Sequence, residues 1–464
     1  MTNYETIYEK NILPKYGKRR ENDKFLLSNN NIPHKYSVLE RLDLKDKVVF
    51  TIDPEGCEDA DDGFSIYYED SKLFLAIHIA DPTELINLNS NLWEDICNRV
   101  ITHYPSFNKP IHLMPDEILK ASSLTSDSNE SEEKNAISII SEIDLDSYLP
   151  TNNIKLEFSS VVVNKKYRFT YEEASKIKDL NYELKLALMI SEALYKQRCN
   201  KTIGAKLSEI NNIYVDKNEN ELYIGKDNDD IRLLKHMIGE FAILANSFVG
   251  EYLKINLQGM GIFRTCDANL INNNSNLTGR EILNEIIDKG ISAEYLSSIS
   301  SHDLVGTPVY CHFTSPIRRL ADCVCHYLLR SIKLQIESPW SKEDLEKISK
   351  RCFEVTKKEK NIQYDDTKFR VIQLLKILSK DKLEIGIRIT KYTGLFINCM
   401  INKIYFNDEE FDTQLSYSLR IKRNLKFSIS DLTKKIKIEN VNPFEKFDEN
   451  SLPDLDNYLK SLFD

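Results

Sequence analysis

A short acidic segment near the start of the chain constrains the fold more than any other feature of the sequence. Six of the ten residues from 53 to 62 are carboxylates, and apolar runs with the pattern of β-strands flank them, Val48–Ile52 and Phe64–Tyr68. Such side chains repel one another at neutral pH unless cations neutralise them, and hard oxygen ligands favour magnesium, manganese or calcium. The sequence therefore predicts a metal site between two strands, in preference to a solvated acidic turn.

Composition sets only broad limits. The chain has 464 residues, 41% hydrophobic and 29% charged, which is typical of a soluble protein of two or three domains. No stretch has the roughly 18 apolar residues of a membrane span and the first residues lack a signal sequence, so we expect an intracellular protein with no membrane partner. The nine cysteines include no CxxC pair and are expected to be reduced thiols. The net charge of −10 argues weakly against bulk attraction to nucleic acid, but a local basic groove would not show in that sum.

Apolar periodicity indicates how strands and helices alternate along the chain. The residues Glu69–Lys72 join two alternating runs and predict a hairpin turn. The patterns of Tyr171–Lys196 and Leu233–Tyr252 each predict one helix, the second with its apolar face buried. Residues 383–440 alternate like strands and predict a small C-terminal β unit, with a boundary near Asp381.

A calcium-binding loop is an alternative interpretation of the acidic segment. Glu58, Asp62, Gly63 and Glu69 match positions one, five, six and twelve of an EF-hand loop. Ala60 would then occupy position three, and strands rather than helices flank the segment, so we do not favour this interpretation.

Two separated motifs resemble the signatures of one enzyme family. Four aspartates follow the first strand at a defined spacing: Asp53, Asp59, Asp61 and Asp62. Together with His78–Pro82 they resemble the first signature of the RNase II/RNB exoribonucleases, and His312–Asp322 resembles the second. Two long motifs in the right order are more specific than one short pattern. The resemblance covers roughly residues 46–375.

The resemblance implies an α+β fold in which an RNB catalytic domain, a mixed sheet with surrounding helices, precedes a small β-barrel of S1/OB type. We place an N-terminal extension at 1–45, the catalytic domain at 46–380, the barrel at 381–445 and a tail at 446–464. Family members typically carry cold-shock barrels before the catalytic domain, and the extension is too short for one.

The resemblance also implies a function. It predicts a hydrolytic 3′→5′ exoribonuclease that degrades single-stranded RNA to nucleoside 5′-monophosphates with Mg²⁺, or alternatively Mn²⁺. By analogy Asp53, Asp59 and Asp62 are metal ligands. Asp61 belongs to the same metal site, where it orients the metal and its water, and it is the residue on which the chemical step depends most. Metal ions held in this way can activate a water and neutralise the scissile phosphate. RNA is the one partner expected, with the protein a monomer.

Arg318 is the candidate for contacting that phosphate. Ser315 and Pro316 predict the N-cap and first turn of a helix, which would place Arg318 where the helix dipole disfavours a cation unless an anion binds. The alternative is a surface arginine paired with Asp322. Arg319 is a weaker candidate for RNA contact.

Two further candidates for RNA contact come from matches to the family pattern. Tyr104 corresponds in position to an aromatic that stacks on a base, although a core tyrosine is an equal alternative. Glu240 lies in the apolar helix pattern, where a carboxylate needs a partner or faces a rim, and we expect it to contact RNA. His78, His312 and His326 are expected to be structural. Because the N-terminal barrels are missing, a catalytically inactive RNB-fold RNA-binding or regulatory protein stays open as the alternative function.

Overall fold

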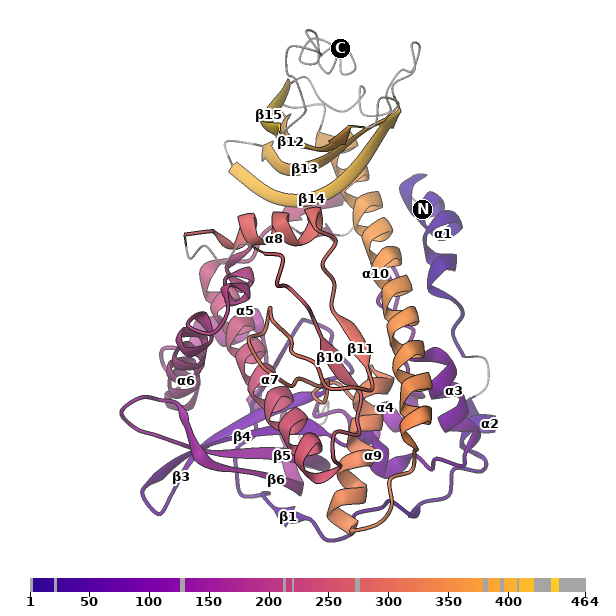
Figure 1. Ribbon diagram of the computed structural model, residues 1–464, viewed down its shortest axis with the longest axis vertical. Coiled ribbons are helices and arrows are strands. Elements are labelled where there is room, and N and C mark those ends of the chain that lie inside the picture. The colour runs from indigo at the N-terminus through magenta and orange to yellow at the C-terminus, as the bar shows by residue number, and fades with distance from the viewer. Residues whose placement is uncertain are drawn as a thin grey trace.

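In the computed structural model, an α+β unit of helices packed on a mixed sheet carries a separate C-terminal sheet (Figure 1). The structure describes residues 3–20, 23–125, 130–211, 214–218, 221–271, 276–378, 383–392, 396–406, 409–420 and 435–441. Among these residues, no helix combines the length and the apolar character needed to cross a membrane.

The main sheet has five strands in the order β1-β6-β5-β4-β3. Their bounds are Leu42–Asp43 for β1, Pro150–Val163 for β6, Glu132–Ile143 for β5, Lys72–Ala80 for β4 and Asp62–Glu69 for β3. Only β1 runs parallel to its neighbour. Asp70 and Ser71 form the tight turn between β3 and β4 with φ of 48° and 63°. The predicted hairpin is therefore confirmed.

The first predicted strand is shorter than expected, and it pairs outside the main sheet. Strand β2, Thr51–Asp53, pairs in parallel with β7, Arg168–Thr170, in a small separate sheet. Two backbone hydrogen bonds between Phe50 and Phe64, of 2.8 and 2.9 Å, tie it to β3. Gly63 permits this approach, because a Cβ there would lie 3.0 Å from the carbonyl oxygen of Phe50.

Eight α-helices of at least seven residues surround the sheet within the described part of the catalytic region. They are α3 Asn91–Arg99, α4 Asp116–Ser122, α5 Tyr171–Ile177, α6 Tyr182–Cys199, α7 Asp229–Asn256, α8 Gly279–Asp288, α9 Leu320–Leu334 and α10 Lys342–Leu378. The prediction of one helix over 171–196 is wrong. Asn181 starts a new helix there by accepting a hydrogen bond from the Leu184 amide at 2.8 Å.

Helix α7 has the predicted buried face. Leu234, Met237 and Phe241 are at most 2% exposed, and the ring of Phe241 meets Phe64 of β3 edge-on at 5.4 Å. Leu233 was expected on this face but is 41% exposed. This contact places the helix beside the strand that begins at the acidic loop.

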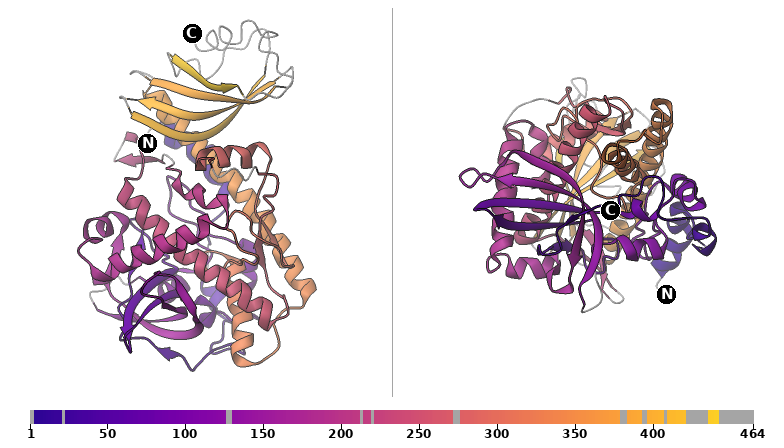
Figure 2. Two further views of the ribbon diagram at one scale, coloured as in Figure 1. Left: turned by 60° about the vertical axis from the view of Figure 1, so that its left-hand side comes forward. Right: turned by 90° about the horizontal axis from the view of Figure 1, so that it is seen from below.

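The predicted N-terminal extension contains short helices. They are α1 Asn3–Asn11, the 3₁₀ helix η1 Leu13–Tyr16 and α2 Asp23–Leu27. Both views of Figure 2 and that of Figure 1 place the N-terminus at the edge of the helical body.

The predicted C-terminal β unit is a four-stranded sheet in the order β14-β13-β12-β15. Its strands are β12 Leu383–Tyr392, β13 Phe396–Phe406, β14 Glu409–Arg420 and β15 Lys435–Val441. Closure of this sheet into an S1/OB barrel stays a prediction. The expected tail, 446–464, lies outside the described residues.

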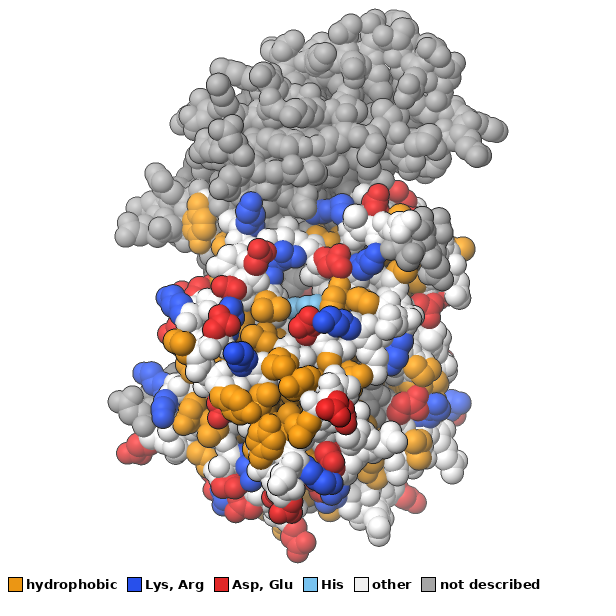
Figure 3. Space-filling view, turned by 90° about the vertical axis from the view of Figure 1, so that its left-hand side faces the viewer, with side chains coloured by type: hydrophobic (Ala, Val, Ile, Leu, Met, Phe, Trp, Pro, Cys, Tyr) orange, Lys and Arg blue, Asp and Glu red, His pale blue; other side chains and the backbone are white. Residues whose placement is uncertain are grey.

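Two antiparallel two-stranded sheets complete the described strands. They are β8 Tyr214–Asn218 with β9 Glu221–Gly225, and β10 Phe263–Thr265 with β11 Glu294–Leu296. On the face seen in Figure 3, acidic and basic side chains are interspersed and apolar side chains gather in the lower half.

Candidate active site

The acidic loop connects the end of β2 to the start of β3 and is fixed by hydrogen bonds at its inner end. The Ala60 amide donates to Ser123 Oγ at 3.1 Å, directly after α4. The Ala80 amide, at the end of β4, donates to the carbonyl oxygen of Asp61 at 2.8 Å. The carboxylates therefore stand on an anchored backbone at the edge of the main sheet.

Asp61 and Arg318 meet although they lie 257 positions apart in the chain. Arg318 Nε donates to Asp61 Oδ2 at 2.8 Å, and the Ile317 amide donates to Asp61 Oδ1 at 2.8 Å. Arg318 Nη2 also donates to Ser315 Oγ at 2.9 Å. The side chain of Asp61 is 2% exposed and that of Arg318 is 42% exposed. The guanidinium thus spans from the buried carboxylate to the surface.

The predicted reason for the position of Arg318 is wrong. Helix α9 begins at Leu320 and not at Ser315, so Arg318 precedes the helix and does not oppose its dipole. The Ser315 amide donates to Asp322 Oδ1 at 2.8 Å. Asp322 is paired with Arg319, at 2.8 Å, and not with Arg318. This ion pair positions Arg319 within the fold, and its RNA contact stays a prediction.

Asp59 is held by a loop that follows α3. Tyr104 Oη donates to Asp59 Oδ2 at 2.5 Å, and His112 Nδ1 lies 3.7 Å from the same oxygen. Tyr104 is 39% exposed, so it is not a core tyrosine. Sequence reasoning missed His112, because no motif or spacing marks it and only the folding back of the chain brings it to Asp59.

Burial makes the ionised aspartates costly. Burial, together with the charges of Asp62 and Asp59, raises the pKa of Asp53 to about 7, although Arg168 opposes this. Burial raises the pKa of Asp61 to about 8 although Arg318 opposes it. The pKa of Asp62 is also raised by burial. Clustered carboxylates with raised pKa values are typical of functional sites.

The donor set fits a hard divalent cation chemically. All four aspartates offer oxygen ligands, and Asp53 Oδ2 is buried without a hydrogen-bond partner in the described structure. Among the residues that the structure describes, no three His, Cys, Asp or Glu side chains are arranged so that they could hold a metal ion. Each oxygen of Asp61 accepts one hydrogen bond from the protein, and each keeps a second lone pair that a metal could use.

Glu240 contacts Arg198 and His236. Its carboxylate, 2% exposed, accepts two hydrogen bonds of 3.1 Å from Arg198 Nε, and His236 Nε2 lies 3.3 Å away. The expected RNA contact stays a prediction, and the geometry gives this carboxylate a partner within the protein instead.

The calcium-loop interpretation is wrong. Its second half, from Asp62 to Glu69, is the extended strand β3. An extended strand cannot wrap its side chains around one ion as an EF-hand loop does. The acidic residues that remain together are those before and at the start of this strand.

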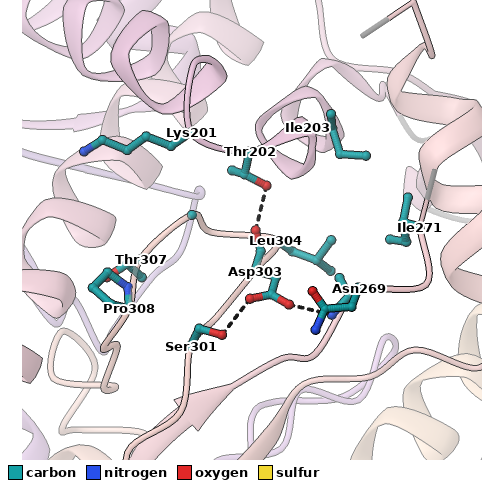
Figure 4. A pocket seen from close by; sticks show the side chains of 12 residues that line it. Lys201, Thr202, Ile203, Asn269, Ile271, Ser301, Asp303, Leu304, Thr307 and Pro308 are labelled. Atoms are coloured by element: carbon teal, nitrogen blue, oxygen red, sulfur yellow. Dashed lines mark hydrogen bonds between the residues drawn. The ribbon is translucent and has the colours of Figure 1, made fainter. Parts of the chain in front are cut away.

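A separate pocket of about 330 Å³ lies between the start of η4, Ile203–Glu209, and two loops (Figure 4). Its one carboxylate, Asp303, accepts hydrogen bonds from Ser301 Oγ at 2.6 Å and from the Ala268 amide at 2.9 Å. None of the predicted site residues lines it. The pocket is therefore distinct from the acidic loop.

Comparison with known proteins identifies the family. The sequence pattern of the RNB domain matches residues 41–335, which is more than half of the chain. The chain belongs to the RNB domain family. It is 26% identical over 336 residues to the exosome complex exonuclease dis3 of Schizosaccharomyces pombe, covering 62% of this chain and 34% of that protein. It is 25% identical over 436 residues to ribonuclease R of Helicobacter pylori, covering 81% and 65%. The chain thus spans less than two thirds of either relative.

Solved structures share the RNB fold. Mycoplasma genitalium RNase R in complex with ribose-methylated single-stranded RNA has a TM-score of 0.66 at 18% identity, covering 90% of this chain and 75% of that one. Yeast Ssd1, a pseudonuclease, has a TM-score of 0.59 at 17% identity, covering 78% and 49%. This likeness shows the fold alone. Because a pseudonuclease also has it, the RNB fold does not decide activity.

Proposed function

We propose that this protein is a metal-dependent exoribonuclease that hydrolyses single-stranded RNA from the 3′ end and releases nucleoside 5′-monophosphates. One observation carries the proposal, namely that the buried carboxylate of Asp61 and the half-exposed guanidinium of Arg318 meet at 2.8 Å. A carboxylate cluster beside an arginine provides sites for a cation and for a phosphate anion at adjacent positions.

The four aspartates have different surroundings, which supports different roles. Asp53, with its free buried oxygen, and Asp59 and Asp62 are proposed as ligands for Mg²⁺ or Mn²⁺. Bound at this site, the metal would lower the pKa of a water and neutralise charge on the phosphate. Asp61 orients the guanidinium and the Ile317 amide and so fixes the phosphate-binding side of the site.

Arg318 is proposed to hold the scissile phosphate. Its Nε donates to Asp61 and its Nη2 to Ser315. The exposed edge of the guanidinium has further N–H groups that can donate to phosphate oxygens. A fixed cation there stabilises the negative charge that develops as water attacks phosphorus.

Tyr104 is proposed to stack on a base next to that phosphate. Its hydroxyl is fixed on Asp59, while the residue is 39% exposed, which leaves ring surface for a nucleobase. Base–aromatic stacking is tolerant of sequence, as a degradative enzyme requires.

The proposal is tested with single-stranded RNA labelled at the 5′ end and, separately, at the 3′ end. With Mg²⁺, the 5′-labelled strand should shorten progressively, and the 3′ label should appear at once as a mononucleotide. A chelator or the Asp61→Asn substitution should stop both. Failure of the pure protein to shorten RNA, or equal shortening by the Asp61→Asn variant, would overturn the proposal. DNA of the same sequence reports whether the sugar is recognised.

One observation favours the second candidate, an RNA-binding protein without catalysis. Each oxygen of Asp61 accepts a hydrogen bond from the protein itself, so this carboxylate is held in place without a metal. Tight RNA binding that is unaffected by Mg²⁺, together with no release of nucleotides over hours, would support this function.

A further inference from the structure

The N-terminal segment, residues 3–20, is packed firmly although it lies outside the matched family region 41–335. Tyr8, Ile12 and Tyr16 are 1%, 7% and 3% exposed, and they form a small core with Ile111 and Ile362. This core is separate from the main one. Ile111 belongs to the Tyr104 loop, residues 101–113, and Ile362 belongs to α10. The segment thus packs against both the Tyr104 loop and the longest helix.

A buried carboxylate on α10 links the segment to the loop. Asp366, 1% exposed, accepts hydrogen bonds from Tyr8 Oη at 2.8 Å and from Tyr16 Oη at 2.7 Å. Its other oxygen accepts from Ser106 Oγ at 2.7 Å, and the Ser106 amide donates to Tyr8 Oη at 3.0 Å. Ser106 comes two residues after Tyr104, so this network holds one side of the loop.

Two arginines at the end of the segment hold the other side. Arg19 Nη2 donates to Asn108 Oδ1 at 2.9 Å and to the Lys109 carbonyl at 2.6 Å. Arg20 Nη1 donates to the carbonyl oxygen of His112 at 3.0 Å. Hydrogen bonds from charged donors are roughly twice as strong as those between neutral groups. The loop is therefore held before and after its tip.

We propose that the N-terminal segment is a positioning element of the active site, which sets where Tyr104 and His112 stand relative to Asp59. These two side chains lie 2.5 and 3.7 Å from the same oxygen of Asp59. Both side chains belong to the Tyr104 loop, which the segment holds at Ser106 and at the His112 carbonyl. A displacement of about 1 Å at a reacting group can cost about a hundredfold in rate. The catalytic part of this inference rests on the proposed function, while the structural part does not.

Hydrogen exchange in the full-length protein tests the structural part without RNA. Arg20→Ala is the main variant, because its partner Asp95 keeps a second ion pair with Arg99 at 2.9 Å. The amides of the Tyr104 loop should exchange about tenfold faster in this variant and, to a smaller extent, in Tyr8→Phe. Lys15→Ala is the control, since Lys15 binds Asp365 on α10 at 2.7 Å and both side chains are more than 40% exposed. Unchanged exchange in the loop of the Arg20→Ala variant would overturn the inference.

A double-mutant cycle tests the catalytic part and separates positioning from general stabilisation. Arg20→Ala should lower kcat/KM for RNA cleavage about tenfold in the otherwise unchanged protein, and less than about twofold when Tyr104 is already alanine. Equal losses in both backgrounds would show that the segment acts only through stability and would overturn the positioning role. If the unchanged protein does not cleave RNA, the proposed function fails, and the exchange measurement still decides the inference.

Discussion

Replacing Arg318 by alanine should separate activity from stability. Its side chain is 42% exposed and makes one ion pair, with Asp61 at 2.8 Å. A surface ion pair contributes about 0.2–1 kcal/mol, and removing one partner of a fully buried pair costs about 3–5 kcal/mol. This pair lies between the two cases, because Asp61 is 2% exposed. The free energy of unfolding should therefore fall by about 2–3 kcal/mol.

The cleavage rate should fall by far more than the loss of folded protein explains. Loss of one preorganised donor to a developing negative charge costs about 10²–10³ in kcat. Removing the guanidinium also removes the charge that opposes the raised pKa of Asp61, so this pKa should rise further. The assay is single-turnover shortening of end-labelled RNA at saturating Mg²⁺, with urea unfolding of the same samples.

Arg232→Ala is the control for loss of a surface arginine. Arg232 has a side-chain exposure of 32% and pairs at 3.1 Å with Asp229, which is 97% exposed. It also donates to the Glu209 carbonyl at 2.6 Å. Its loss should destabilise the protein by about 1–2 kcal/mol and leave the rate within about twofold. An Arg318→Ala variant with nearly unchanged rate, or a rate that falls only in proportion to unfolded protein, would refute the reasoning.

Three other predictions concern stability, pH and RNA contact. Asp81→Asn should lower the free energy of unfolding by about 3–5 kcal/mol in urea titrations, since it removes the buried one of the two carboxylates, Asp81 and Glu84, that two buried guanidinium groups share. In metal-free protein, the free energy of unfolding should fall as pH rises from about 4 to about 8, because Asp53 and Asp61 bind protons more tightly in the folded than in the unfolded protein. Excess Mg²⁺ should flatten this slope in thermal melts. A slope of opposite sign would contradict the raised pKa values. Glu240→Gln should destabilise the fold through Arg198 and leave KM for RNA unchanged, whereas a tenfold rise in KM would restore the predicted RNA contact.

Local sequence patterns predicted the hairpin and the buried face of α7 because these depend on neighbouring residues. The hairpin needs only two alternating runs and a tight turn, and Asp70 and Ser71 supply the turn. The break between α5 and α6 was missed although Asn181 is a good N-cap, because the apolar pattern continues across it. Strand pairing could not be predicted, since the parallel partner of β2 lies more than 100 residues away in β7.

The candidate site shows the same limit. The spacing of acidic residues placed four aspartates on one short loop, and their joint binding of a metal stays a prediction. That Arg318 would reach Asp61 followed only from the family resemblance. The helix-dipole argument for Arg318 was wrong, because α9 begins at Leu320, two residues after Arg318. His112 and the N-terminal segment carry no local signal. Their positions depend on contacts between distant parts of the chain, which one sequence does not reveal.

The most direct test of the central claim is the anomalous scattering of Mn²⁺ in crystals of the metal-loaded protein. We expect a peak within coordination distance, about 2.0–2.2 Å, of oxygens from at least two of Asp53, Asp59 and Asp62, with Arg318 beside it. Asp61→Asn crystals should show a weaker peak. The claim is contradicted if saturating Mn²⁺ leaves no peak at these aspartates, or if they bind only groups of the protein.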